Sequence, residues 1–196
     1  MIDYLTDLDQ RLFLFLNNLG NPSWDNFWIF ITHKFSSIPV YFILLILIFR
    51  KFGWKGTFLI IIFVALLITW TDQISGLFKY GIQRPRPCQI LREQMRPVLV
   101  NCGRYGYFSA HAANAGAISV FIGLILKRWY PKSIYILLIW AGIVAYSRIY
   151  LGVHYPLDIL SGMLFGLPSG WIFYRLFLYF QKRLNIVQSD ELSSLS

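Results

Sequence analysis

Charged side chains are scarce in this sequence of 196 residues. Asp, Glu, Lys and Arg together account for 14% of it, whereas soluble domains usually contain about 25%. Apolar residues account for 57% and aromatic residues for 18%. This composition argues against a soluble globular protein and indicates an integral membrane protein. The length is that of one domain, and no repeat, linker or low-complexity stretch divides it.

Histidine and cysteine are also rare, with three and two residues respectively. Zinc sites need three or four His, Cys, Asp or Glu ligands. The one group that approaches this requirement consists of His111, His154 and Asp158, and arginines lie around it that would repel a cation. We therefore expect no metal and no other cofactor. Nothing in the sequence indicates a nucleic-acid partner or an obligate protein partner.

Five apolar runs predict five membrane-spanning helices, at residues 27–50, 57–78, 109–127, 132–151 and 156–180. With their weakly polar flanks, most of these runs reach about 20 residues, which matches a hydrocarbon layer about 30 Å thick. The first run contains His33, Lys34 and Pro39, so we expect a break or kink within it.

Residues 1–185 are expected to form one membrane-embedded domain of the all-α class, a bundle of five to six transmembrane helices, followed by a polar tail at 186–196. The N-terminal part predicts an amphipathic helix that lies in the membrane interface, with a sixth span as the alternative. Its apolar residues recur near helical spacing, at Leu5, Leu8, Leu12, Phe15, Leu16 and Leu19, and they are interrupted by Asp7, Asp9 and Arg11. No basic stretch precedes this helix, so we expect no cleavable signal peptide.

Basic residues predict which ends of the spans face the cytoplasm, because short loops rich in Lys and Arg stay there. Three such clusters fall on one side of a five-span bundle: Arg50, Lys51 and Lys55; Lys127, Arg128 and Lys132; and Lys182 and Arg183. The loop over 79–104 lies on the opposite side, yet it holds a single acid, Glu93, against Lys79, Arg84, Arg86, Arg92, Arg96 and Arg104. Either anionic lipid headgroups attract this loop, or it forms a site for a phosphorylated ligand.

Both cysteines, Cys88 and Cys102, lie in this loop. On the outer side of a membrane they can form a disulfide, which would stabilise the protein by roughly 3 kcal/mol in chain-entropy terms. Two unrelated thiols are the alternative. We predict the disulfide.

One polar cluster forms the beginning of this loop, and a second follows its end. In KYGIQRPRP, residues 79–87, Lys79 ends the second span, and a proline on either side of Arg86 stiffens the chain. In YFSAHAANAGA, residues 107–117, Ser109 is a candidate N-cap. His111 then falls in the first turn of a helix, where free N–H groups and the helix dipole favour an anion.

A third cluster, SRIYLGVHYPLD, joins the fourth and fifth spans. Arg148 lies near the outer end of the fourth span. If the fifth helix begins at Pro156, the Asp158 carboxylate can reach back to His154. A carboxylate on one ring nitrogen fixes the tautomer and leaves the other nitrogen free to act as a nucleophile.

Each cluster alone has an ordinary structural explanation. A single histidine at a helix start is usually a surface residue, His154 and Asp158 alone can be a simple hydrogen-bonded pair, and Arg148 can extend to the interface. Because the spans alternate in direction, however, all three clusters fall at one membrane face. This convergence predicts a functional site there, while His33 is expected to have a structural or interfacial role.

The three clusters resemble the motifs of the type 2 phosphatidic acid phosphatase superfamily, which also includes bacterial nonspecific acid phosphatases and vanadium haloperoxidases. The resemblance covers about residues 57–180. The first and third motifs match completely: Lys79 with Arg86 and Pro87, and Ser147 and Arg148 with His154 and Asp158. The second departs from the usual PSGH, because Phe108 and Ala110 flank the retained Ser109 and His111.

The resemblance implies a role for each matching residue. His154 would attack phosphorus and form a phosphohistidine, and Asp158 would orient it. His111 would protonate the leaving oxygen and later activate water. The phosphoryl oxygens would be held by Lys79, Arg86, Ser109 and Arg148.

These expectations favour a metal-independent lipid phosphatase of the inner membrane with its site at the periplasmic face. Candidate substrates are undecaprenyl diphosphate, phosphatidylglycerophosphate, phosphatidic acid and lipid A. A lipid phosphotransferase and a non-catalytic lipid carrier are the alternatives. Additional headgroup contacts are possible at Arg92, Arg96 and Arg104. Gly162, Gly166 and Gly170 predict close helix packing, or else a groove for a lipid tail.

Overall fold

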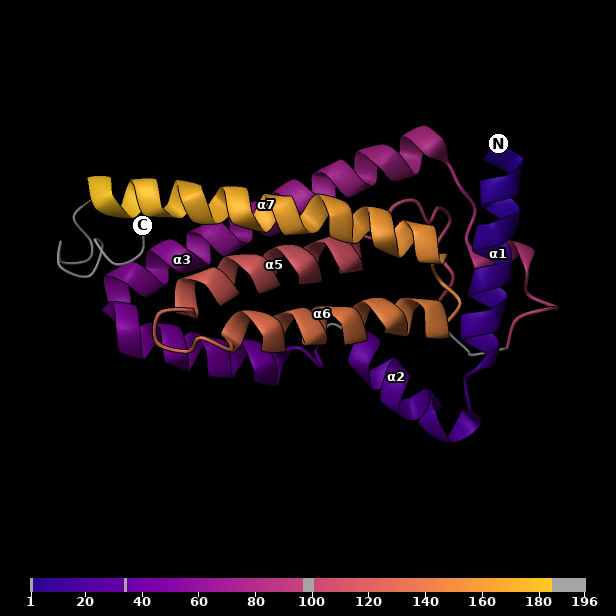
Figure 1. The fold of residues 1–196 in the computed structure, drawn as a ribbon, viewed down its shortest axis with the longest axis horizontal. Coiled ribbons are helices and arrows are strands. Elements are labelled where there is room, and N and C mark those ends of the chain that lie inside the picture. The colour runs from indigo at the N-terminus through magenta and orange to yellow at the C-terminus, as the bar shows by residue number, and fades with distance from the viewer. Residues whose placement is uncertain (1, 34, 97–100, 185–196) are drawn as a thin grey trace.

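The computed structural model describes residues 2–33, 35–96 and 101–184, and it is all-α over this part of the chain, as predicted (Figure 1). The polar tail expected at 186–196 lies outside the described residues. The helices are α1 (Ile2–Asn18), the short 3₁₀ helix η1 (Pro22–Trp24), α2 (Asp25–Thr32), α3 (Ile38–Ile82), α4 (Pro87–Ile90), α5 (Ala110–Leu126), α6 (Ser133–Tyr150) and α7 (Pro156–Arg183).

Helices α3, α5, α6 and α7 run along the long axis of the molecule and form the bundle (Figure 1). Helix α3 bends sharply at Gly53, whose φ of 59° and ψ of −170° are not helical, so its two limbs run in different directions. A positive φ of this kind favours glycine. The two apolar runs expected at 27–50 and 57–78 therefore meet at a bend within one element, rather than being joined by a loop.

The break predicted in the first apolar run is confirmed. Helix α2 ends at Thr32 and α3 begins at Ile38, with Pro39 in its first turn. The second limb of α3 continues to Ile82, so Lys79 lies in its last turn rather than ending it. Among the residues that the structure describes, three helices, α3, α6 and α7, are long and apolar enough to cross a membrane, and α5 is a shorter apolar helix of 17 residues.

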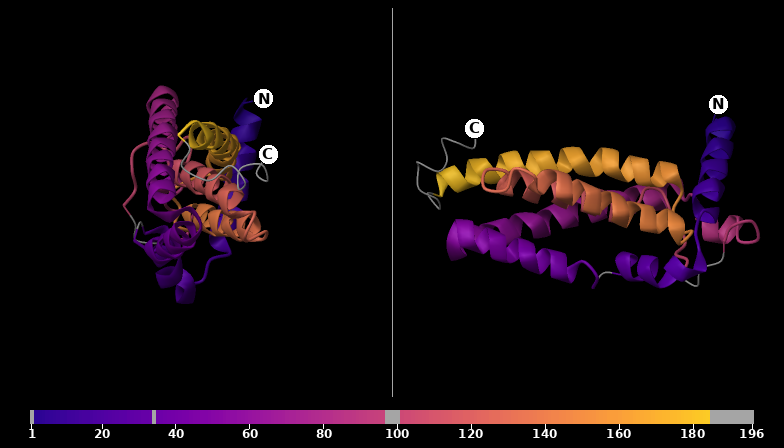
Figure 2. Two further views of the ribbon diagram at one scale, coloured as in Figure 1. Left: turned by 90° about the vertical axis from the view of Figure 1, so that its left-hand side faces the viewer. Right: turned by 60° about the horizontal axis from the view of Figure 1, so that its bottom comes forward.

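Helix α1 lies across one end of the bundle, nearly at right angles to it (Figure 1 and the right-hand view of Figure 2). Its apolar side chains at positions 5, 8, 12 and 15 are exposed, as is that of Leu19 just after the helix, as expected of an interfacial helix. The opposite face of α1 is buried against the bundle and consists of Asp9, Phe13 and Asn17. Asn17 fixes the end of α1, because its amide donates to the carbonyl oxygens of Ile149 and Tyr150 at 3.1 and 2.8 Å.

The glycine repeat of α7 packs against the small residues of α5. A Cβ at Gly166 would lie 2.2 Å from the carbonyl oxygen of Ala113, and one at Gly170 would lie 2.3 Å from that of Ala117. The prediction of close helix packing is confirmed. Because the two helices are parallel and both begin at the end of the bundle that α1 crosses, this contact also fixes where α5 begins relative to the start of α7.

The other half of the bundle holds a core of stacked aromatic and aliphatic side chains. Phe63, Phe121 and Phe177 pack together there, with Phe121 fully buried. The bend of α3, the α5–α6 connection and the end of α7 lie at this end (Figure 1). The three basic clusters that predict a cytoplasmic face belong to these segments, opposite the end that α1 crosses.

A matched pair of alanine substitutions tests the α5–α7 contact. Gly166→Ala should lower the free energy of unfolding by about 1–3 kcal/mol, because the added methyl group forces the helices apart. Gly142→Ala on α6 meets nothing within 4 Å. It should be neutral or stabilise by up to about 1 kcal/mol through helix propensity. Thermal unfolding in detergent compares the two variants, and equal melting temperatures would contradict the packing account.

Candidate active site

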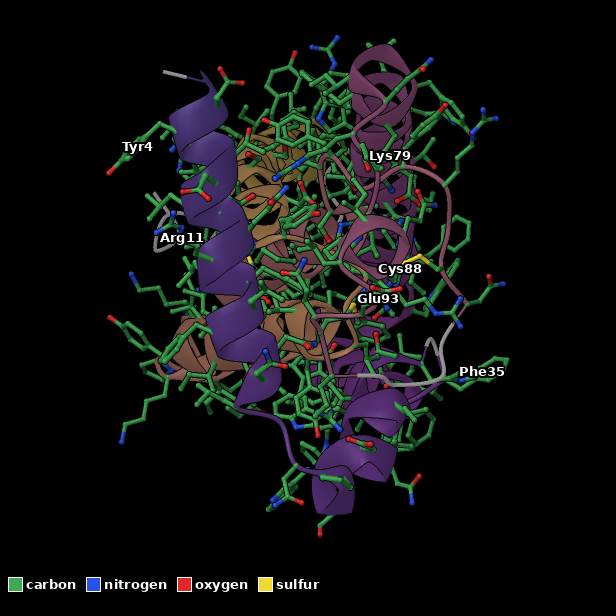
Figure 3. The ribbon with its side chains drawn as sticks, turned by 90° about the vertical axis from the view of Figure 1, so that its right-hand side faces the viewer. Tyr4, Arg11, Phe35, Lys79, Cys88 and Glu93 are labelled. Atoms are coloured by element: carbon green, nitrogen blue, oxygen red, sulfur yellow. A yellow bond between two sulfur atoms is a disulfide. The ribbon has the colours of Figure 1, made fainter. Side chains whose placement is uncertain are left out.

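The polar residues predicted to converge lie at the end of the bundle that α1 crosses. Helices α3 and α6 end here, and α5 and α7 begin here (Figure 1). Figure 3 looks onto this end: α1 with Arg11 passes along one side, and Lys79 and Cys88 lie on the other.

His154 and Asp158 form a buried pair. After α6 the chain turns through Gly152, whose φ is 70°, and Tyr155 then caps α7. His154 is 1% exposed and Asp158 is fully buried. The Nδ1 atom of His154 lies 3.3 Å from Oδ2 of Asp158. The same oxygen accepts the backbone N–H of Tyr155 at 3.0 Å, so the carboxylate is fixed by the helix start as well as by the histidine.

Burial lowers the pKa of the His154 imidazole to about 4, although the hydrogen bond to the Asp158 carboxylate acts in the opposite direction. The ring is therefore neutral at physiological pH. With Nδ1 directed at the carboxylate, the lone pair lies on Nε2, which is the form that a nucleophile requires.

The second carboxylate oxygen of Asp158 is bound by a residue that the sequence reasoning left unassigned. Arg84 places Nη1 2.9 Å from Oδ1 of Asp158 and Nη2 2.6 Å from Oδ2 of Asp9 on α1. Its guanidinium also lies over the ring of Tyr155, 4.1 Å from the ring centre. In the sequence, Asp9 is one of several charged residues in the N-terminal helix, and no spacing links it to Arg84.

The start of α5 is joined directly to the His154–Asp158 pair. Ser109 caps the helix, and its Oγ accepts the N–H of Ala112 at 3.4 Å, as its position predicts. Its own N–H donates to the backbone carbonyl of Asp158 at 3.0 Å. Ala110 is the first helical residue and has no positive φ, so the glycine of PSGH is not required at this position.

His111 follows in the first turn of α5, with an exposed side chain. Four of the other predicted site residues lie within electrostatic reach of its imidazole: Arg148, His154, Lys79 and Arg86. The structure thus brings the two histidines and the cations of the three sequence clusters into one electrostatic neighbourhood.

The guanidinium groups of Arg86 and Arg148 donate hydrogen bonds to uncharged oxygens. Arg86 donates from Nε to the carbonyl of Tyr105 at 3.0 Å and from Nη1 to that of Val153 at 3.4 Å. Arg148 donates from Nη1 to the hydroxyl of Thr32, at the end of α2. Lys79, Arg86 and Arg148 repel one another. A bound dianion would relieve this repulsion, so the arrangement suits a phosphoryl group.

The loop that carries Arg86 is tied down at several points. Cys88 and Cys102 are joined by a disulfide, and the N–H of Cys88 donates to the carbonyl of Gly152 at 3.0 Å. The amide of Gln89 donates to the carbonyl of Gly103 at 3.0 Å. Gly106 leaves room for the carboxylate, because a Cβ there would lie 3.0 Å from Oδ2 of Asp158.

The remaining basic residues divide into two groups. Arg96 has a structural role, because it forms a salt bridge of 2.7 Å with Asp25 and stacks on the ring of Tyr150. Arg92 and Arg104 are exposed.

His33 lies at the end of α2, where its Nδ1 accepts the N–H of Phe35 at 3.4 Å, in keeping with a local structural role.

Comparison with known proteins places these features in a family. The PAP2 superfamily model matches residues 54–182. A lipid A 4′-phosphatase of Bacteroides thetaiotaomicron is 37% identical over 180 residues, covering 89% of this chain and 79% of the relative. A lipid A 4′-phosphatase of Porphyromonas gingivalis is 30% identical over 188 residues, covering 93% and 78%. The crystal structure of a transmembrane PAP2-type phosphatidylglycerolphosphate phosphatase from Bacillus subtilis has the same fold, with a TM-score of 0.69 at 21% identity over 92% of this chain and 87% of that one.

Removal of the disulfide should loosen the loop that holds Arg86. The double variant Cys88→Ser, Cys102→Ser should lose about 2–4 kcal/mol of stability, the range usual for such bonds. Intact mass after alkylation without reductant measures the bond directly, and it should show no modified thiol in the wild-type protein. Two alkylated cysteines would contradict the bond.

Proposed function

Because this chain belongs to the PAP2 superfamily and is a membrane lipid phosphatase, we propose that it hydrolyses a phosphate monoester of a lipid A-type glycolipid through a phosphohistidine on His154. The observation that carries this proposal is the buried His154–Asp158 pair beside three cations and a second histidine. A binding protein needs the cations, but it does not need a nucleophile with an orienting acid.

The proposed reaction has two steps. Nε2 of His154 attacks phosphorus, and the bond from phosphorus to the lipid oxygen breaks while protonated His111 gives that oxygen its proton. A water molecule then attacks the phosphohistidine, His111 accepts a proton from it, and the P–N bond breaks to release inorganic phosphate. Phosphoryl transfer depends mainly on positioning and on stabilisation of the equatorial oxygens. Lys79, Arg86 and Arg148 would supply that stabilisation, together with Ser109 and the free N–H groups of α5.

The substrate class follows from the relatives and from the surroundings of the site. Both relatives described above are lipid A 4′-phosphatases, and each is matched over most of its length. The site lies where polar residues meet apolar helices, so a lipid tail would lie among the helices while its phosphate reaches the cations. Undecaprenyl diphosphate, phosphatidylglycerophosphate and phosphatidic acid are the competing substrates in this proposal.

The proposed orientation places the site at the periplasmic face of the inner membrane. The three basic clusters at the opposite end of the bundle favour the cytoplasm. The disulfide in the site loop suits an oxidising compartment. In this orientation α3 crosses the bilayer with each of its limbs, and α5, α6 and α7 complete five crossings, with α1 on the outer surface.

Replacement of the nucleophile should abolish the reaction. His154→Ala should show no turnover, and His111→Ala should reduce kcat by about 10²–10⁴-fold, as is usual for loss of a general acid–base. His33→Ala is the matched control and should retain full activity. Phosphate release from a panel of purified lipid phosphates, with and without chelator, measures all three variants and ranks the substrates. Full activity of His154→Ala, or loss of activity with chelator, would contradict the mechanism.

The acid limb of the pH dependence of kcat/KM reports the protonation of His154 in the free enzyme. Because its folded pKa is about 4, the attacking ring stays neutral at higher pH and becomes inactive as the pH falls through that value. The acid side of the profile should therefore stay level down to roughly pH 5, well below the ordinary histidine pKa of about 6.5. An acid limb centred near pH 6.5 would show that the ring is solvated rather than buried.

A further inference from the structure

The Arg84 guanidinium lies between two buried carboxylates that come from opposite ends of the sequence. One belongs to Asp9 in α1 and the other to Asp158 in α7. Building on the function proposed above, we propose that Asp9 and Arg84 are positioning residues, which hold the Asp158 carboxylate and through it the His154 ring in line with the phosphorus atom. Helix α1 is then part of the active site rather than only a membrane anchor.

The geometry of the guanidinium favours this role over phosphate binding. Nη1 and Nη2 each point at a different carboxylate, at 2.9 and 2.6 Å, and the flat face rests on the ring of Tyr155. Arg84 is 18% exposed in its side chain. Both terminal nitrogens therefore have a charged partner already, whereas the hydrogen bonds of Arg86 from Nε and Nη1 both go to backbone carbonyl oxygens. The two arginines on either side of Pro85 thus have opposite tasks: one binds the enzyme's own carboxylates and the other is available for an anion.

The burial of the two acids makes the bridge necessary. Asp9 is 2% exposed and Asp158 is fully buried, so an unpaired charge on either would be costly. Without Arg84, the Asp158 carboxylate would lack its strongest partner and would be free to turn away from Nδ1 of His154. Lysine cannot replace arginine here, since a single ammonium group cannot bridge both carboxylates and stack on the tyrosine ring.

Helix α1 also contacts the catalytic segment directly. The second oxygen of Asp9 accepts the N–H of Leu157, in the first turn of α7, at 2.9 Å. Phe13, one turn further along α1, packs edge-on against Tyr155 with ring centres 5.5 Å apart. The outer face of α1 is apolar and exposed, so insertion into the membrane surface would hold the helix in place and, through Asp9, the start of α7.

Two substitutions test the bridge. Asp9→Asn keeps the size of the side chain and its acceptor for Leu157 but removes the charge that faces Arg84. Arg84→Lys keeps the charge but cannot form the bridge. Each should lower kcat for detergent-dispersed lipid A by about 10–100-fold, as is usual for groups that orient a catalytic ligand. KM and the inhibition constant of inorganic phosphate should change by less than about twofold, because the anion-binding residues are intact. The double variant should be no worse than Arg84→Lys alone, since the two residues act as one unit.

Asp7→Asn is the matched control on the same helix. Asp7 pairs only with Arg11, and both side chains are more than half exposed, so this variant should behave as the wild type. Size-exclusion profiles and thermal melts in detergent select folded protein. If Arg84→Lys does not fold, Asp9→Asn alone decides.

Two results would overturn the inference: a wild-type kcat in folded Asp9→Asn, or an unchanged kcat with a raised phosphate inhibition constant in Arg84→Lys, which would make Arg84 a phosphate ligand. His154→Ala is assayed in parallel. Its inactivity together with wild-type behaviour of both bridge variants would refute the bridge and leave the proposed function intact, whereas full activity of His154→Ala would refute the proposed function itself.

Discussion

One buried carboxylate, that of Asp158, is the point on which the rest of this end of the molecule depends. Its two oxygens meet the His154 ring, the N–H of Tyr155 and the guanidinium of Arg84, while its backbone carbonyl accepts the N–H of Ser109. The loop after α3, the start of α5 and the start of α7 are therefore joined at this one residue, and α1 is joined to it through Arg84. Because a buried charge needs several partners, the same contacts that satisfy Asp158 also fix the geometry of the candidate nucleophile.

The contact between α5 and α7 is the second requirement for this arrangement. Gly166 and Gly170 allow the backbones to approach so closely that even a methyl group would collide with a carbonyl oxygen. This approach places the capped start of α5 beside the start of α7, and therefore His111 beside His154. Packing in the apolar part of the bundle thus sets the position of polar groups at its end, and a lipid phosphatase of this kind needs no soluble domain to build its site.

The sequence predicted those features that depend on local chemistry. The break after Thr32, the cap at Ser109, the start of α7 at Pro156 and the glycine contact all follow from local propensity, spacing or residue size. Arg84 and Asp9 were missed because their partners are distant in sequence: Asp158 lies 74 residues from Arg84, and Asp9 faces Leu157 across 148 residues. The bend at Gly53 was missed for a different reason: the basic residues Arg50, Lys51 and Lys55 predicted a connecting loop, whereas α3 is helical on both sides of the glycine. The salt bridge of Arg96 was not predicted because its partner Asp25 lies in another element.

The central claim is that His154, held by Asp158, is the nucleophile and that its Nε2 atom forms a covalent bond to phosphorus. Rapid quenching of the wild-type enzyme with a ³²P-labelled lipid phosphate, followed by peptide mapping at alkaline pH, measures this bond directly. The account predicts a phosphoramidate, stable to base and labile to acid, in the peptide that contains His154. Label on a different residue, or full turnover with no labelled enzyme at any quench time, would contradict it.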